Sequence, residues 1–398
     1  MQRFCPILRR LFAVAIACSA TLLTAQSKPK SLLQILNVPF KGVTDSFPTS
    51  VISATSTSNV WIVTPNKSLN FNGSTWMEQT LPSPFVIQGG VAAIASNNVW
   101  AVGYNFANGN TELVEHFDGK QWSLVQDVNL VGTQVFINGV THGTVMNEAL
   151  TSISAISAND IFAGGFVNTE IQTLPFVEHW NGTEWSVLPF LPIGGGQTVV
   201  VQSIAAFSDT DVWAVGSSKP NPSASIFPKS WHFNGKTWTE ISGAPAIMGA
   251  FETITAIAPN DIWAGGYQEF PNVLFAPMAQ HWNGTRWTIV PFPNPSFYPT
   301  TGAPNLSIAA VSSTSVWAVS TRLDPILFVA QPYVEHWNGA NWNLEILPFC
   351  PAQECDLAAV TTLPTGQVWA AGYAFDLLSG ILPNDLFNPF VLLTIQGK

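Results

Sequence analysis

The phrases Asp160-Ile161-Phe162-Ala163-Gly164-Gly165 and His179-Trp180-Asn181-Gly182-Thr183-Glu184-Trp185 decide the fold of this chain, because both recur along it. The first phrase combines a polar turn residue, an aromatic residue and small apolar residues. It returns seven times, with its aromatic residue at positions 61, 100, 162, 213, 263, 317 and 369. Such a period is typical of a supersecondary unit that stacks on its neighbours.

The second phrase predicts a hairpin at the end of each of the first six repeats. Asn-Gly or Asp-Gly between two apolar runs favours a two-residue type I′ turn, which needs positive φ at both central positions. A short strand of alternating character, such as 152–156, precedes the first phrase and is joined to it by a tight polar turn. Each repeat therefore predicts four antiparallel strands.

The two ends of the chain indicate how the repeats are arranged. The seventh repeat stops at 389–396, where a third strand is expected, while 31–39 resembles a fourth strand that lacks the first three. We therefore predict an all-β fold, a seven-bladed β-propeller of four-stranded antiparallel blades, with the ring closed by the N-terminal strand pairing into the last blade. A linear solenoid would need polar caps at both ends, and none is visible in the sequence.

The N-terminus resembles an export signal. Three arginines, Arg3, Arg9 and Arg10, precede an apolar stretch that ends before a small-residue cleavage site after Ala25. We expect a signal peptide at 1–25 and one propeller domain at 26–398. The apolar stretch is too short for a membrane span, so we expect no membrane insertion after cleavage. The mature protein is then secreted, periplasmic or at the cell surface.

Two other interpretations of the N-terminus stay open. Cys18 can serve as the lipid-modified first residue of a lipoprotein. The pair Arg9-Arg10 resembles a twin-arginine signal, although the polar residue that usually precedes the pair is missing. All of these interpretations place the protein outside the cytoplasm.

The charge of the chain excludes one class of partner. The net charge is −10, and loss of the three leader arginines makes it −13. Such a field repels phosphate backbones and anionic lipid surfaces, so we expect no nucleic-acid partner. We predict a monomer without cofactors whose ligand is an extracellular protein or glycan.

Two cysteines, Cys350 and Cys355, remain after the leader is removed. In an oxidising compartment we expect them to form a local disulfide, with free thiols or an intermolecular bridge as alternatives. Two cysteines without a nearby pair of histidines do not make a metal site.

Five of the six histidines occupy one repeat position, two residues before the Asn or Asp of the hairpin turn. Such regularity favours a structural role, in which each ring hydrogen-bonds a polar turn. A metal-binding ring of imidazoles is the alternative, but it requires the third strands of different blades to converge. We predict no metal site, and a structural role for His116, His179, His232, His281 and His336. The repeated tryptophans predict packing between blades.

The long connections of a propeller of this strand order all lie on one face, and loops on a rigid scaffold usually carry binding residues. The alternative is that their aromatic residues only seal the loops onto the blades. The predicted ligand-binding residues on this loop-rich face are Phe106, Phe136, His142, Phe270, Tyr298, Arg322, Asp324, Tyr373 and Asp376.

The phrases Asp-Val-Trp-Ala-Val-Gly and His-Trp-Asn-Gly-Thr-x-Trp resemble those of a family of secreted bacterial propeller repeats, distantly similar to kelch and bacterial neuraminidase repeats. The resemblance covers about residues 31 to 398. It implies a β-propeller and carries no established activity. One departure from the pattern is the enlarged connection at 126–150.

Known catalytic sites fit the sequence poorly. A sialidase-like site needs three arginines around a carboxylate, and the mature chain has only Arg286 and Arg322. Common hydrolase and zinc motifs are also missing from the sequence. We therefore predict an exported, non-catalytic binding propeller with no catalytic residues. The alternatives are a glycan-active hydrolase or lyase that uses two acids, Asp324 and Asp376, and a surface scaffold within an envelope complex.

Overall fold

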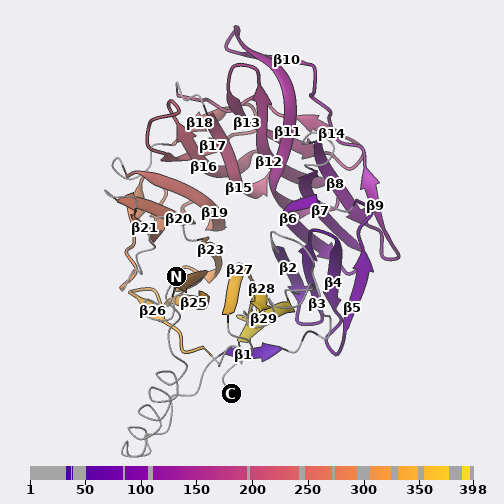
Figure 1. Ribbon diagram of the computed structural model, residues 1–398, viewed down its shortest axis with the longest axis vertical. Helices are drawn as coiled ribbons and strands as arrows, with labels where there is room; N and C mark the ends of the chain where they lie inside the picture. The colour runs from indigo at the N-terminus through magenta and orange to yellow at the C-terminus, as the bar shows by residue number, and fades with distance from the viewer. Residues whose placement is uncertain are drawn as a thin grey trace, which may run out of the picture. The chain divides into compact units, whose positions relative to one another are not determined.

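The computed structural model describes residues 33–36, 38, 51–83, 86–105, 111–194, 198–241, 247–270, 274–293, 305–323, 330–347, 354–375 and 388–394. Within these ranges every regular element is a β-strand, which confirms the predicted all-β class. No helix of the described residues has the length and apolar character needed to span a membrane. The arrangement is propeller-like, with four-stranded antiparallel blades (Figure 1).

Four blades each contain four strands that are consecutive in the chain. The first is β2 (Val51–Ser56), β3 (Asn59–Thr64), β4 (Lys67–Phe71) and β5 (Trp76–Thr80). The next is β6 (Val86–Ala95), β7 (Asn98–Asn105), β8 (Thr111–Phe117) and β9 (Trp122–Val125). Further along lie β19 (Gly249–Ala258), β20 (Asp261–Phe270), β21 (Leu274–Trp282) and β22 (Trp287–Ile289). The last of them is β23 (Ser307–Ser312), β24 (Ser315–Leu323), β25 (Ala330–Trp337) and β26 (Trp342–Leu344).

A nine-stranded sheet occupies the middle of the chain. It contains a run of β11 (Val140–Ser157), β12 (Asp160–Thr169), β13 (Thr173–Trp180) and β14 (Trp185–Val187). A second run is β15 (Thr198–Ser208), β16 (Asp211–Lys219), β17 (Phe227–Phe233) and β18 (Trp238–Glu240). One parallel pair, Thr173 with Thr198, links the two runs. The short strand β10 (Gln134–Ile137) pairs with the start of β11.

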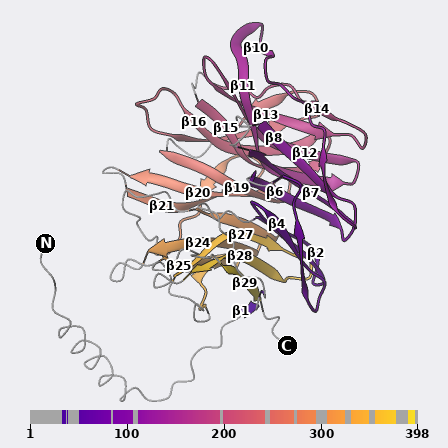
Figure 2. The same ribbon diagram turned by 45° about the vertical axis from the view of Figure 1, so that its right-hand side comes forward.

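The remaining sheet joins the two ends of the described chain. Its order is β1 (Leu33–Leu36), β29 (Asn388–Thr394), β28 (Val368–Phe375) and β27 (Glu354–Thr362). The register runs antiparallel from Leu33 opposite Thr394 to Leu36 opposite Val391. The predicted pairing of the N-terminal strand with the last strand is therefore confirmed. Figure 2 shows β1 beside β29.

The turns of the second phrase differ from the prediction. In the first hairpin Phe71 pairs with Trp76, so the loop has four residues instead of two. Gly73 has a φ of 95°, but Asn138 is the only non-glycine residue with positive φ in the described part of the chain. The Asn72 Oδ1 atom instead accepts hydrogen bonds from the amides of Ser74 and Thr75. This Asx turn replaces the type I′ turn, because a side-chain acceptor satisfies the backbone donors locally.

Aromatic side chains fill the space between neighbouring blades. The repeated aromatic residue of each second strand contacts aromatic residues of the next blade. For example, the ring centroids of Trp61 and Phe117 are 4.8 Å apart. The same contact recurs between Trp213 and Trp282 at 5.3 Å. Large buried aromatics of this kind dominate core energetics. The predicted packing role of the repeated tryptophans is confirmed for these contacts.

Hydroxyl groups tie the first strands of successive blades together. Ser53 Oγ accepts a hydrogen bond from the amide of Ala93 at 3.0 Å. Ser307 Oγ accepts one from the amide of Val360 at 3.1 Å. These bonds satisfy backbone donors that no strand within the same blade can reach. They fix the spacing of the innermost strands.

Candidate functional site

The structure describes only part of the predicted ligand-binding set. Phe106, Tyr298, Asp324 and Asp376 lie outside the described residues. Arg322 belongs to β24, and Phe270 ends β20 opposite Leu274.

Tyr373 is at odds with its predicted place on an open surface. Its side chain in β28 is only 1% exposed, because the residue lies inside a central strand opposite Asp356. Phe136 and His142 come together on one hairpin. That hairpin is the candidate site.

The hairpin of β10 and the start of β11, residues Gln134 to Met146, is here called the projecting hairpin. Its turn is Asn138-Gly139, with φ of 52° and 77°, and Ile137 pairs with Val140 across it. This is the two-residue turn with positive φ at both positions that Asn-Gly favours. β11 has 18 residues while β12 has 10, so the hairpin extends past the end of β12 (Figures 1 and 2).

Polar contacts fix the projecting hairpin to the turn between β12 and β13. Thr169 Oγ1 donates to the carbonyl oxygen of His142 at 2.8 Å. The amide of Thr144 donates to Glu170 Oε2 at 2.5 Å. The side-chain amide of Gln172 donates to His142 Nδ1. These contacts hold the hairpin in one position.

Apolar side chains of the projecting hairpin split into buried and exposed sets. Val135 and Val145 are buried and join the core beneath the hairpin. Large exposed apolar side chains lie on the hairpin or beside it: Val131, Phe136, Val140, Met146 and Ile171, with Phe136 at 58% exposure. Exposed apolar groups that gather in one place usually mark an interaction site.

The charge around the projecting hairpin has one sign. From residue 121 to residue 218 the sequence has no lysine or arginine and eight acids. Glu170, which accepts the amide of Thr144, is an exposed member of this set beside the hairpin. A negative field at the surface attracts cationic groups and repels anionic ones.

A cluster of carboxyl groups beneath the projecting hairpin was missed by sequence reasoning. It is formed by Glu112 of β8, Asp127 of the following connection, Glu148 of β11 and Glu178 of β13, and is here called the carboxyl cluster. Burial raises the pKa of Asp127 to about 6, of Glu148 to about 7 and of Glu178 to about 9. The sequence held one signal for this cluster: glutamates occupy strand positions that the alternation of inward and outward side chains assigns to the core.

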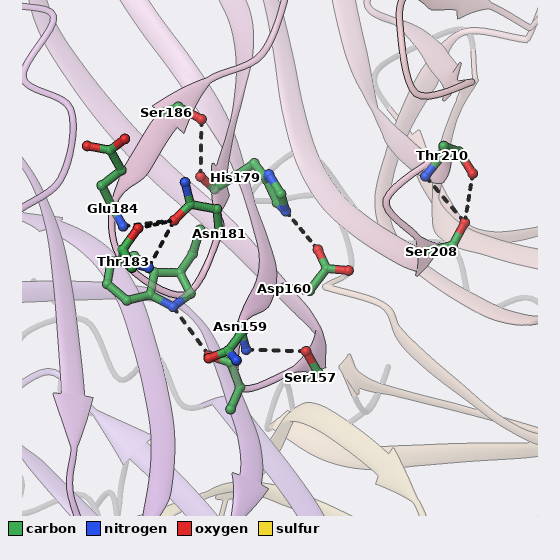
Figure 3. A network of polar contacts seen from close by, with 12 residues as sticks. Ser157, Asn159, Asp160, His179, Asn181, Thr183, Glu184, Ser186, Ser208 and Thr210 are labelled. Atoms are coloured by element: carbon green, nitrogen blue, oxygen red, sulfur yellow. Dashed lines mark hydrogen bonds and ion pairs between the residues drawn. The ribbon is translucent and has the colours of Figure 1, made fainter.

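The repeat histidines contact the first residue of the preceding second strand. His179 Nε2 lies 2.7 Å from Asp160 Oδ1, as Figure 3 shows. The same contact joins His232 to Asp211 and His281 to Asp261, while His116 meets Asn98 and His336 meets Ser315. Each ring also packs against the repeated aromatic, with ring centroids 4.1 to 4.7 Å apart. Burial lowers the pKa of His116 and of His336.

Metal-ligating and thiol groups add little to the site. No group of three or more His, Cys, Asp or Glu side chains within the described ranges is arranged to hold a metal ion. Cys355 is buried in β27, and Cys350 lies outside the described residues.

Comparison with known proteins supports the fold class. No protein-family model matches the chain, and no curated protein matches it in sequence. A structure of YCF48 bound to D1 peptide is 12% identical, with a TM-score of 0.50 over 94% of this chain and 100% of that chain. A PL25 ulvan lyase bound to a saccharide is 9% identical, with a TM-score of 0.53 over 85% of this chain and 93% of that chain. These neighbours are β-propeller-like proteins.

A lectin shows a weaker likeness. The fucose-specific lectin from Aleuria aurantia is 11% identical, with a TM-score of 0.43 over 89% of this chain and 97% of that chain. At this identity the comparisons establish the fold alone, because one fold carries many functions.

Proposed function

We propose that this chain is an exported, non-catalytic propeller that binds an extracellular protein or glycan through its loop-rich face. One observation carries the proposal: the projecting hairpin is fixed by polar contacts, yet it exposes Phe136, Val140 and Met146 to solvent. A hairpin that is already ordered loses little conformational entropy on binding. Exposed apolar groups on such a support favour recognition over catalysis.

We infer further that the blades form a closed ring of seven. The pairing of β1 with β29 supports this, because it completes the last blade. Contact between β27 and β2, and the packing of Trp369 on Phe71, bring the last sheet against the first. In this arrangement β11–β14 and β15–β18 are two blades linked by the single Thr173–Thr198 pair. The resemblance of the repeat phrases to those of secreted propeller repeats agrees with this inference.

Several parts of the proposal concern the mature protein. We propose a signal peptide at 1–25, one domain at 26–398, and a monomer without metal or cofactor. The bridge between Cys350 and Cys355 belongs to the same proposal. The repeat histidines have a structural role in this proposal, since each hydrogen-bonds the first residue of the preceding second strand and packs against a buried aromatic.

A glycan-active hydrolase or lyase is the alternative function. Its proposed acids, Asp324 and Asp376, lie outside the described residues. Among the described acids with raised pKa values, Glu112, Glu148 and Glu178 are at most 4% exposed, whereas Asp127, Glu345 and Asp356 are half-buried. A polymer cannot reach the first three, and a general acid must lie within hydrogen-bond reach of the bond it cleaves. The support for binding comes from the exposed apolar side chains of the projecting hairpin.

Purified mature protein tested on a glycan array and on a panel of extracellular proteins checks the proposal. We expect saturable binding that Phe136→Ser weakens and Leu344→Ser leaves unchanged. Leu344 is the matched control because its side chain is 47% exposed on an outer strand, away from the projecting hairpin. Turnover of a glycan that is abolished by Asp324→Asn or Asp376→Asn would instead establish the enzyme.

A further inference from the structure

The strand β10 of the projecting hairpin has one open edge. In its sheet β10 pairs with β11, and no strand of the described residues pairs with it on the other side. The opposite edge of the hairpin is occupied, because the backbone of β11 bonds to the side chains of Thr169 and Glu170. An exposed strand edge is a template on which a further strand can pair. In the projecting hairpin, β10 is the strand that offers such an edge.

Phe136 directs its backbone groups toward this open edge. Opposite residues of an antiparallel pair alternate between hydrogen-bonded and non-hydrogen-bonded pairs. Ile137 and Val140 close the two-residue turn and form a hydrogen-bonded pair. Phe136 and Thr141 are the next pair along the ladder, so they are not hydrogen-bonded to each other. The amide and the carbonyl group of Phe136 therefore point away from β11.

Gln134 has the same orientation. It lies opposite Thr144, but the amide of Thr144 donates to a carboxylate of the neighbouring turn. The next bond of the ladder runs from the amide of Val145 to the carbonyl oxygen of Thr133, as expected beside a non-hydrogen-bonded pair. Gln134 and Phe136 are two residues apart, which is the period of a strand. Their amides and carbonyl groups form one row along the open edge.

The outward face of the hairpin carries apolar side chains beside this row. Val135 and Val145 are buried, so the alternate positions Gln134, Phe136 and Met146 face solvent. Phe136 is 58% exposed and Met146 is 55% exposed. An apolar side chain on an added strand would pack on Phe136, as cross-strand pairs do within a sheet. The open edge thus offers both backbone hydrogen bonds and an apolar contact.

The hairpin lacks the residues that usually prevent pairing at a strand edge. Natural edge strands often carry charged side chains or proline. From 128 to 147 the sequence contains no proline and no Asp, Glu, Lys or Arg. The strand β10 has only four residues, which limits pairing to one short segment. This combination favours binding of a defined segment over unlimited association of strands.

The surrounding charge indicates which segment fits. From 121 to 218 the sequence has eight acids and neither lysine nor arginine, and the exposed Glu170 lies beside the hairpin. A cationic segment is attracted by such a field, whereas a second copy of this chain, with its net charge of −10, is repelled. A strand edge repeats its donors and acceptors at the spacing of another peptide backbone, and a glycan has no such repeat. A basic peptide is therefore the best complement.

We propose that the projecting hairpin binds an extended segment of another protein, which adds to β10 as a further strand. The segment has apolar residues at alternate positions, with lysine or arginine between them. Backbone hydrogen bonds to Gln134 and Phe136 hold it, one of its apolar residues packs on the Phe136 ring, and the acidic surroundings attract its basic residues. This inference rests on the proposed binding function and names the class of partner.

A designed peptide tests this mode of binding on the intact mature protein. The probe is a fluorescein-labelled peptide of about eight residues that alternates Lys and Val, and fluorescence anisotropy measures its affinity. We expect saturable binding, and none for a peptide that alternates Glu and Val. N-methylation of two consecutive residues removes one donor from each edge of the Lys-Val peptide and should weaken binding at least about tenfold. Absence of Lys-Val binding, or equal binding of either control peptide, overturns the proposal.

Two substitutions at one position separate the backbone contact from the side chain. Gln134→Pro removes the amide that faces the open edge, and proline is compatible with an edge position whose amide faces solvent. Gln134→Ala keeps that amide. We expect the Lys-Val peptide to bind at least about tenfold more weakly to Gln134→Pro, and within about twofold of the wild type to Gln134→Ala. Equal affinity of the two variants overturns the proposal.

Hydrogen exchange of the wild type, measured by NMR, locates the peptide without any variant. Bound Lys-Val peptide should slow exchange of the Gln134 and Phe136 amides. Slowing that is confined to an outer strand such as β9 overturns the proposal even if Gln134→Pro does not fold. A glycan whose binding is weakened by Phe136→Ser, without any peptide binding, overturns this inference and leaves the proposed binding function intact. Peptide binding at β10 with no natural ligand on either panel would count against the proposed function alone.

Discussion

The rings of Trp369 in β28 and Phe71 in β4 lie with their centroids 5.6 Å apart, so the last sheet of the chain packs against the first. Val391 of β29 and Ile52 of β2 join the same core. The contact connects residues almost 300 positions apart in the sequence. We expect this contact to contribute as much to the stability of the domain as a contact between repeats that are adjacent in the sequence.

We expect Trp369→Ala to lower the free energy of unfolding by about 3 to 5 kcal/mol, because it opens a large cavity in a close-packed core. Denaturant unfolding followed by tryptophan fluorescence and circular dichroism measures the loss. Trp337→Ala is the control and should cost less, since Trp337 is partly exposed. An equal loss of unfolding free energy in both variants would contradict a larger contribution of this core to stability.

The strand β1 should protect the edge of β29. Ile35 lies opposite Leu392, and a proline at 35 removes a backbone donor from the pairing. We expect Ile35→Pro to destabilise the fold and to promote aggregation, because the edge of β29 becomes available to other chains. Light scattering during storage measures this. Ile35→Val keeps the strand and should remain monodisperse; aggregation of both variants would contradict the explanation.

The histidine contacts should contribute to stability one blade at a time. Asp261→Ala leaves His281 without its partner at 2.8 Å, and we expect a loss of about 1 to 3 kcal/mol. Asp209→Ala changes an exposed acid near the equivalent turn of another blade and should stay within about 0.5 kcal/mol of the wild type. Denaturant midpoints compare the two variants. Indistinguishable midpoints would mean that the His281 ring finds another partner.

Glu252 of β19 makes the stability of the fold depend on pH. Its Oε2 atom accepts the amide of Leu306 at 2.9 Å, and burial raises its pKa to about 7. Because the folded pKa is raised, stability from this group is present at low pH and is lost as the pH rises through about 7. We expect Glu252→Gln to reduce the fall in stability between about pH 4.5, the ordinary pKa of a glutamate, and about pH 7. An unchanged slope in this variant would show that Glu252 does not titrate in that range.

The turn of the projecting hairpin should be separable from the rest of the fold. Gly139 has a φ of 77°, and no atom lies within 4 Å of the position that a Cβ would take. Gly139→Ala therefore costs only backbone strain, about 1 to 2 kcal/mol, and should raise exchange of the hairpin amides while the domain stays folded. Gly366→Ala at the turn after β27 has equally open space and a φ of 88°, and it should leave the hairpin unchanged. Global unfolding in Gly139→Ala would contradict a local role.

Local chemistry explains which features could be predicted. The turn phrases and the two-residue alternation marked the strands, and a missing fourth strand in the last repeat predicted the pairing of 31–39 with the C-terminal strand, now seen at Leu33 to Leu36. The type of hairpin turn was wrong. Whether Asn72 adopts positive φ depends on which group satisfies the turn amides. Here the Asn72 side chain accepts the amide of Thr75, which a local pattern does not reveal.

The candidate site was only partly predictable. Phe136 and His142 were singled out because they lie in an unusually long connection, and the structure places both on the projecting hairpin. Tyr373 was chosen by the same reasoning, but it is buried, because burial depends on which sheet covers a strand end.

By itself, the sequence determined the repeat, the strands and the partner of the first strand, since hydrophobic period and turn residues act over a few positions. Tertiary structure alone decided that Glu112 and Glu178 are buried, that Gln172 reaches His142, and that the apolar side chains beside that contact remain in water. The physical reason is distance along the chain. Burial, electrostatic repulsion and hydrogen bonding between such residues arise only when separate strands come together, and no local pattern encodes which groups then face each other.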